Sequence, residues 1–485
     1  MAGIKKNFLY NVSYQLLNIL LPLVTTPYLS RVLGPELVGV YSYTYSITYY
    51  FVLFATCGMS TYGVRAIART MDDRRERSRV FWSAYIAQLL LGLLVFAVYV
   101  GYAAVIHEGG IAISVIWGMY VFSALVDVSW LLFGCNDFKV PTIRSASVRL
   151  IQFFAVFIFV QGKDGLPAYI FINSVGFLAN QLLIWPFIRK HVDFCRPTWR
   201  EVQVHFIPNI RLFLPVIAVS LYTTLDKIML GAMSNMTQAG YFEYAEKISR
   251  LPLTAITALG TVMLPKMSEL IASNQKARVH QLIEKSAWVM LAVAFAFSFG
   301  IMAVGDVFVP VYLGEKFIDA IPLMVIMSVI IPIISVTNII GKQFMLPSLM
   351  DSQYTISLLL GAVVNIVVNL TLIPRFAALG ASIGTVAAES TVLVAQAVLV
   401  RGQINFRRLI RIAVPFLGMG LLMMAIVRAC SGAIVGRFGV SLTALGIEVV
   451  LGGLVYFVAA LAYCLITKDR IAVSLLPATR KNARS

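Results

Sequence analysis

Charged residues are scarce in this chain, and their scarcity decides its class. Only 13% of the 485 residues are Asp, Glu, Lys or Arg, whereas 59% are hydrophobic, and the mean hydropathy is +0.85. A soluble protein of this length cannot bury so much apolar surface. The sequence therefore predicts an all-α, polytopic membrane protein. We expect its net charge of +17 to reflect membrane topology rather than a nucleic-acid partner.

The signatures of enzymes and metal sites are also lacking. The sequence contains no GxxxxGK[ST] loop and no HExxH, and no GxGxxG opens a helix after a strand. The five cysteines show no paired or CxxC spacing, and the four histidines fall outside the expected spans, namely His107, His191, His205 and His280. We therefore expect neither an enzyme nor a resident cofactor or metal.

Long apolar runs are what the sequence has instead. Fourteen are long enough to cross a bilayer, at about 8–30, 36–60, 80–106, 110–133, 143–162, 166–188, 208–231, 238–263, 284–305, 319–341, 352–373, 377–400, 409–430 and 440–466. If the N-terminus is cytoplasmic and the spans alternate, 29 of the 39 basic residues lie inside, 6 outside and 4 within spans. This asymmetry predicts that both termini are cytoplasmic.

The longest connections fall on the predicted cytoplasmic side, at about 61–80, 189–207 and 264–283. Segment Arg65–Val80 is densely charged, and segment His191–Phe206 mixes aromatic with basic residues. Both are typical of short interfacial helices beside anionic headgroups, or of charge that only sets topology.

A short internal repeat relates the two halves of the chain. Gly39 and Gly240 each open a G-x-[YF]-x-Y signature at the start of a span, and the preceding spans carry Pro22 and Pro27 or Pro215. The repeat predicts two six-helix lobes, residues 1–205 and 206–400, with substrate between them, followed by two helices and a tail in 401–485. The prolines, together with Pro252, are candidate hinges because each removes a backbone hydrogen bond.

One expected span carries a charged face. Glu243, Glu246, Lys247 and Arg250 follow one another at helical steps i, i+3, i+4 and i+7. Each would cost several kcal/mol near the bilayer centre if it faced lipid. Either they line a polar pathway, or they form a ladder of ion pairs that satisfy one another.

Other polar side chains extend the candidate site. The basic residues left within spans, Arg149, Lys227, Lys247 and Arg250, suit a phosphate or pyrophosphate group. The carboxylates Asp226, Glu243, Glu246 and Glu389 either bind a coupling H⁺ or Na⁺ or only balance those cations, and Asp226 is placed to meet Lys247 or Arg250. Tyr45 and Tyr49 share a helix face with Tyr41 and could stack on sugar rings, although an interfacial aromatic belt explains such tyrosines too.

Three stretches carry a family resemblance: Asn7–Arg69, Asp226–Pro252 and Ala378–Ser390. They resemble Wzx-type polysaccharide flippases, which share a superfamily with the MATE drug exporters and the lipid II flippases. The resemblance implies a central cavity and alternating access. It also implies that an undecaprenyl-pyrophosphate-linked oligosaccharide is moved to the outer leaflet of the inner membrane, with ion or potential coupling, beside a polysaccharide polymerase.

Two other classes compete with this interpretation. A MATE-like antiporter of small amphipathic cations should have an acidic cavity, whereas the spans here offer four basic groups. An integral-membrane glycosyltransferase or polymerase typically needs a sizeable outer loop, and the expected outer loops are short.

Overall fold

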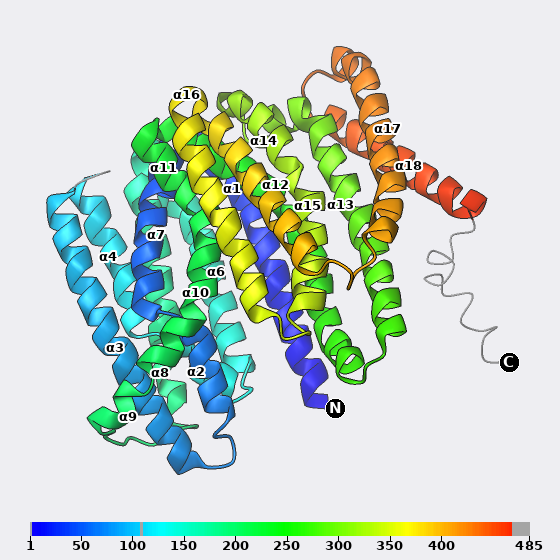
Figure 1. Cartoon of the computed structure of the whole chain (residues 1–485). Coiled ribbons are helices and arrows are strands. Elements are labelled where there is room, and N and C mark those ends of the chain that lie inside the picture. Colours follow the sequence, from blue (N-terminus) through cyan, green and yellow to red (C-terminus); the bar gives the residue numbers. More distant parts are fainter. Residues whose placement is uncertain (1, 107–109, 468–485) are drawn as a thin grey trace. The chain divides into compact units, whose positions relative to one another are not determined.

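The computed structural model describes residues 2–106 and 110–467, without the side chains of 2–16, 18, 19, 255, 259, 261 and 262. Within these residues the chain is almost entirely helical and contains no strand beyond an isolated bridge between Arg401 and Ile404 (Figure 1). The predicted all-α, polytopic membrane fold is confirmed.

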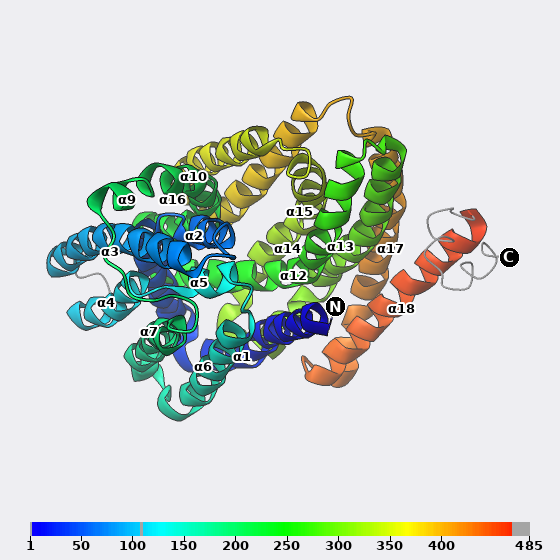
Figure 2. The same ribbon diagram turned by 90° about the horizontal axis from the view of Figure 1, so that it is seen from below.

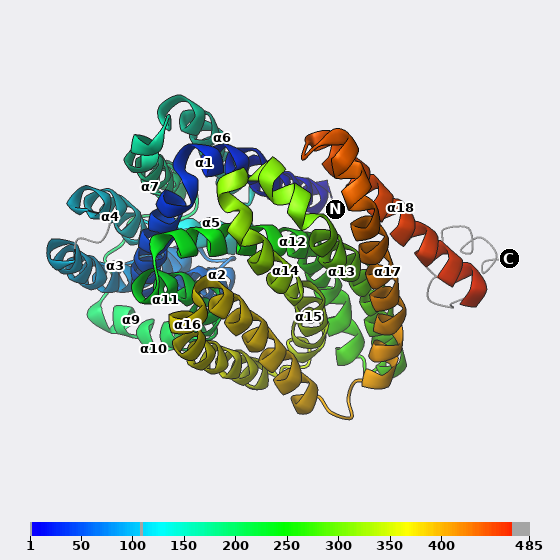
Figure 3. The ribbon, with the colours of Figure 1, turned by 90° about the horizontal axis from the view of Figure 1, so that it is seen from above.

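The chain forms two compact units, Met1–Gly240 and Tyr241–Ser485. The first contains α1 (Ala2–Thr56), α2 (Met59–Ala68), α3 (Arg74–Val105), α4 (Ile111–Leu125), α5 (Ser129–Gly134), α6 (Lys139–Phe159), α7 (Leu166–Leu182), α8 (Trp185–Ile188), α9 (Trp199–Gln203), α10 (Phe206–Thr223) and α11 (Leu225–Met233), with the start of α12 (Met236–Ala272). Its neighbouring helices α3 and α4 lie side by side (Figure 3). The lobe boundaries at 205 and 400 stay a prediction.

The second unit contains the rest of α12 and then α13 (Lys276–Tyr312), α14 (Ile321–Ser328), α15 (Ile330–Thr337), a π-helix (Asn338–Met345), α16 (Asp351–Leu399), α17 (Phe406–Phe438) and α18 (Leu442–Thr467). Helices α13, α17 and α18 pack together, and the Tyr456 hydroxyl of α18 donates to the carbonyl of Ala292 in α13 at 2.7 Å (Figure 2).

The predicted count of fourteen spans is not confirmed. Among the described residues, eleven helical stretches are long and apolar enough to cross a membrane, or twelve if the bent α12 is one span. Two of the eleven are 49 residues long, and each covers two runs that the sequence analysis separated. Each is interrupted by a residue with positive φ, Gly34 at 75° in α1 and Ala377 at 47° in α16. The difference therefore arises where a sharp kink joins two consecutive helices.

The breaks do not all fall at the predicted prolines. Pro215 lies inside α10, whereas the chain leaves helical geometry nine residues later, at Thr224. Helix α12 continues through Pro252 and bends by 45° between the segments Met236–Ala258 and Met263–Ala272.

The two basic connections contain short helical segments, and their place at a membrane interface stays a prediction. Within Arg65–Val80, α2 ends at Ala68, and Asp73 caps α3 by accepting hydrogen bonds from the backbone of Arg75 and Glu76. Within His191–Phe206 only the five residues of α9 are helical before α10 begins. Both segments mostly end one helix and start the next.

The repeated glycines make a close helix crossing in the first unit. A Cβ on Gly39 would collide with the carbonyl oxygen of Met236, and a Cβ on Gly240 with that of Pro35. Each glycine thus faces the residue four positions before its counterpart. The signature recognised in the sequence is glycine because the backbones of α1 and α12 approach too closely for any side chain.

Candidate functional site

The charged face of α12 meets a carboxylate from α16. The Arg250 Nε donates to Glu246 Oε1 at 2.8 Å, one helical turn away, and Arg250 Nη2 lies 4.0 Å from Glu389 Oε1. The Glu246 and Glu389 side chains are each 6% exposed, and that of Arg250 is 27% exposed. One guanidinium therefore stands between two buried carboxylates, with part of its surface open.

The rest of this face fits both interpretations of it. The Glu246–Arg250 pair is what an ion-pair ladder requires. Glu243 and Lys247 are half-buried, Lys247 Nζ lies 5.6 Å from the Tyr244 ring centre, and Pro252 is buried. The partial exposure of the two cations, Lys247 and Arg250, is what a polar pathway requires.

Sequence reasoning missed a polar row on α16. Ser357, Asn365 and Asn369 are fully buried, and together with Gly361 they recur every four residues, which places them on one helix face. Asn369 donates to Asn365 at 3.2 Å, and Gln396, further along α16, donates to Ser357 at 3.3 Å. The four-residue spacing is visible in the sequence, but an uncharged amide inside an apolar run does not by itself indicate a polar pathway.

Several buried amides near this row have polar atoms without a hydrogen-bond partner in the described part of the protein. They are Asn338 Oδ1, Gln343 Oε1, Asn365 Nδ2 and Gln396 Oε1. Buried polar groups normally find a partner in protein or water. The interior of the second unit is therefore polar enough to hold water or a polar ligand.

In the first unit, the predicted acidic and basic neighbours lie just after a helix break. Asp226 is 1% exposed and Lys227 is half-buried, both in the first turn of α11. Nearby, the Tyr50 hydroxyl donates to the carbonyl of Ser220 at 2.9 Å, which ties α1 to the end of α10. The predicted contact of Asp226 with Lys247 or Arg250 stays a prediction.

The predicted sugar-stacking tyrosines belong to an aromatic cluster of the first unit. Tyr45 stacks on Tyr120 with ring centres 5.8 Å apart, and on Phe177 at 6.4 Å. Tyr49 follows Tyr45 at 6.3 Å, and both remain half-buried. The cluster fixes the ring orientations, and contact with sugars stays a prediction.

The remaining predicted residues are more dispersed. Arg149 is exposed on α6. Pro22 and Pro27 lie within α1. His205, expected outside the spans, is instead buried in the apolar stretch Trp199–Thr223, where its ring nitrogens contact the hydroxyls of Tyr62 and Ser83 at 2.6 and 2.7 Å. No group of three or more metal-ligating residues occurs in the described chain.

Comparison with protein families assigns the chain to one. The model described as "Polysaccharide biosynthesis protein" matches residues 4–271, more than half of the chain. The chain belongs to this polysaccharide biosynthesis protein family. The model described as "Lipid II flippase MurJ" matches residues 141–445, so this multi-pass membrane protein also belongs to the family of those flippases. The resemblance to Wzx-type flippases is confirmed.

Individual relatives agree with this assignment. A putative O-antigen transporter of Escherichia coli K12 is 25% identical over 394 residues, which is 80% of this chain and 95% of the relative. A structure of the lipid II flippase MurJ in an inward closed conformation matches with a TM-score of 0.75 at 13% identity, covering 95% and 100% of the two chains. An inward-facing MATE multidrug transporter matches with a TM-score of 0.62 at 14% identity, covering 83% and 95%. These structures establish the fold alone.

Proposed function

We propose that this protein is a flippase that moves an undecaprenyl-pyrophosphate-linked oligosaccharide from the inner to the outer leaflet of the cytoplasmic membrane by alternating access. The observation that carries the proposal is the arrangement of Arg250 between Glu246 and Glu389 in a chain of this family. The relatives named as O-antigen transporter and lipid II flippase support the substrate class.

The guanidinium of Arg250 would bind the pyrophosphate, because its planar fork matches phosphate oxygens in a bidentate way. Lys227, Lys247 and Arg149 would add positive charge along the path, and Tyr45 and Tyr49 would contact the sugars. The basic residues lower the cost of carrying the anion through the membrane, and no covalent chemistry is needed.

Glu246 and Glu389 make this site suitable for ion coupling. When the pyrophosphate takes Arg250, the two carboxylates lose their counter-charge, and a like-charged pair in a poorly hydrated place favours uptake of H⁺ or Na⁺. Loss of the substrate restores the ion pair and releases the cation. Asp226 and Glu243 would act as further sites or balance Lys227 and Lys247.

Reconstitution tests the proposal directly. Proteoliposomes carrying a labelled lipid-linked oligosaccharide in the inner leaflet are exposed to an impermeant glycosidase. We expect the label to become accessible much faster than in protein-free liposomes. A rate equal to that of protein-free liposomes, with and without pH or Na⁺ gradients, would reject the flippase.

The second candidate is a MATE-like antiporter of small amphipathic cations, favoured by the match to a MATE fold. Such an exporter would accumulate a lipophilic cation against a gradient in the same vesicles. The half-exposed Arg250 and Lys247 argue against it, because they would repel cationic cargo.

A further inference from the structure

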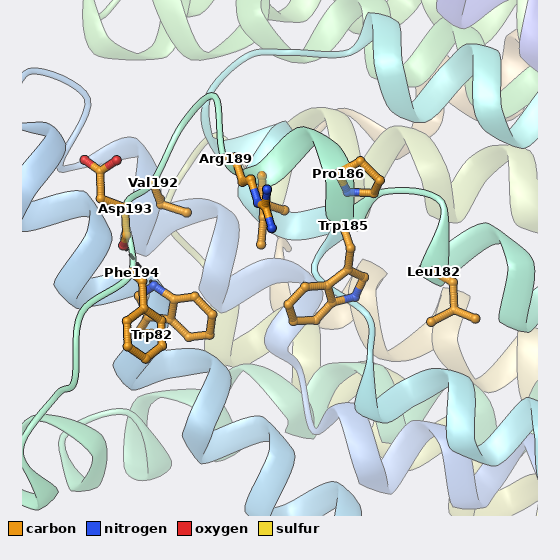
Figure 4. A pocket seen from close by; sticks show the side chains of 9 residues that line it. Trp82, Leu182, Trp185, Pro186, Arg189, Val192, Asp193 and Phe194 are labelled. Atoms are coloured by element: carbon orange, nitrogen blue, oxygen red, sulfur yellow. Dashed lines mark hydrogen bonds between the residues drawn. The ribbon is translucent and has the colours of Figure 1, made fainter.

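A cavity of about 920 Å³ lies in the first unit, and none of the residues assigned above to transport lines it (Figure 4). Its lining comes from α3, α7, α8 and the loop that follows α8: Trp82, Leu182, Trp185, Pro186, Ile188, Arg189, Val192, Asp193 and Phe194. This volume is that of a ligand site.

The sequence of α3 places the cavity at the membrane surface. The helix starts with Arg74–Arg79, which reads RRERSR, and becomes apolar from Val80 onward. Five charges in six residues cannot enter hydrocarbon. Trp82 therefore lies at headgroup depth, where tryptophan is enriched. Basic residues on both sides of the cavity predict that this surface is cytoplasmic.

The loop wall of the cavity is held in place by α3. Arg74 donates two hydrogen bonds to the Asp193 carboxylate at 2.8 Å each, and another to the carbonyl of Arg189 at 3.1 Å. The Trp82 indole donates to the carbonyl of Asp193 at 2.9 Å. The site is therefore preorganised rather than a gap beside a loose loop.

The side chain of Arg189 takes no part in this hydrogen-bond network. Its guanidinium is exposed and makes no hydrogen bond or ion pair within the described residues, and it lies between Trp185 and Val192 in Figure 4. The Asp193 carboxylate points away from the rings, and the hydrogen bonds from Arg74 hold the pKa of Asp193 below its usual range. That carboxylate is thus ionised and already neutralised, and the lining presents one net positive charge.

The aromatic rings complete an amphipathic site. Both indole N–H groups are occupied, that of Trp82 as above and that of Trp185 by the carbonyl of Val126 at 2.9 Å, so their ring surfaces remain for apolar contact. Trp82 and Phe194 pack edge to face with centres 5.1 Å apart, and Phe194 is 71% exposed. An occupant must therefore combine an anionic head with an apolar chain.

We propose that this cavity binds an acidic phospholipid of the surrounding leaflet, with its phosphate on Arg189 and the upper part of an acyl chain against Trp82, Trp185 and Phe194. Charge complementarity favours an acidic lipid over a zwitterionic one, whose ammonium group would cancel the attraction. Continuity with the bilayer favours a lipid over a soluble anion. The site differs in place and ligand from the transport site and does not depend on it.

Tryptophan quenching by brominated lipids tests the proposal. The full chain is reconstituted with brominated phosphatidylglycerol or brominated phosphatidylcholine at equal mole fraction, and the signal of Trp82 and Trp185 is isolated by subtracting that of a W82F/W185F variant. We expect the wild type to favour the acidic lipid. Arg189→Ala should lower this preference about fivefold, as expected for one basic side chain near the surface.

The matched control is Arg200→Ala, which removes the same charge from an exposed position on α9 outside the cavity. It should keep the preference. Equal quenching by both lipids in the wild type, or an equal loss in the two variants, would overturn the site, since either outcome shows only general surface potential. A thermal unfolding scan checks that Arg189→Ala is folded, which we expect because the Arg189 side chain is exposed.

Discussion

Arg250 provides the positive charge between two carboxylates of the second unit, an arrangement that the sequence does not reveal. It faces two carboxylates, Glu246 at 2.8 Å and Glu389 at 4.0 Å. At such distances an attraction is worth about 4 kcal/mol at an effective dielectric constant of 20. Removing one partner of a buried pair typically costs about 3–5 kcal/mol, because it leaves an unpaired charge. We therefore expect any Arg250 variant to disturb local stability as well as the proposed substrate site.

We expect Arg250→Ala to abolish flipping, and Arg250→Lys to reduce it at least tenfold because a point charge lacks the planar fork. The measurement is glycan accessibility in proteoliposomes. Arg375→Ala, an exposed arginine at the turn of α16, is the matched control and should retain activity.

A double variant separates recognition from folding. Arg250→Ala combined with Glu246→Gln restores the charge balance, so it should recover expression and thermal stability but not flipping. Recovery of flipping by this double variant would make Arg250 a structural counter-ion and remove it from the binding site.

The same residues show how far the sequence alone reaches. The Glu246–Arg250 pair was predicted because two residues four apart on a helix are neighbours whatever the tertiary structure. The contact with Glu389 was not, because it requires that α12 and the second half of α16 pack together. The polar row on α16 was missed for a related reason: an amide in an apolar run becomes informative only once its face is known to be buried.

At the scale of the element, the predicted hinge in α10 and the predicted charges in α11 lie on either side of a helix break. Pro215 lies within α10, and Thr224 leaves helical geometry just before Asp226 and Lys227. We propose that these two points in succession let α11 move together with its charges.

We expect Pro215→Ala to restore one backbone hydrogen bond, stiffen α10 and bias the protein toward one facing state. Flipping should fall severalfold at unchanged expression. Cysteine accessibility of positions on either side of the membrane reports the bias. An unchanged rate together with unchanged accessibility would assign the bending to Thr224 instead of Pro215.

The glycine crossing of α1 and α12 gives a second prediction at this scale. Gly240→Ala should lower the free energy of unfolding by about 1–3 kcal/mol, because the added methyl group collides with the carbonyl of Pro35. Gly432→Ala is the control, since the Cβ that alanine adds there would meet no neighbouring residue within 4 Å and alanine favours a helix. An equal loss of thermal stability in the two variants would contradict the close crossing of α1 and α12.

At the scale of the whole molecule, the basic residues predict an orientation that the helices alone do not establish. Cysteines introduced at Asp73 and Gln275 should be labelled only from the cytoplasmic side, and those at Ser234 and Lys163 only from outside. A background without the five native cysteines is required. Labelling of position 73 by an impermeant reagent in intact cells would contradict the topology.

The predicted count of fourteen spans is not confirmed at this same scale, for a physical reason. Hydropathy identifies where a span can exist, but two consecutive helices joined by a one-residue kink run together as one apolar stretch. Gly34 and Ala377 are such kinks. The fold class depends on composition and was predictable, whereas the way in which the spans join depends on single backbone angles.

The kink at Ala377 also bears on how the protein is made. The two halves of α16 leave the ribosome one after the other, and their polar side chains, Asn365, Asn369 and Glu389, would each be costly if a half entered lipid alone. Close packing lets the halves shield one another, since a Cβ on Gly384 would collide with the Asn369 side chain and one on Gly361 would meet the carbonyl of Ala388. The translocon should therefore release α16 into the bilayer as a finished hairpin rather than as two helices in sequence.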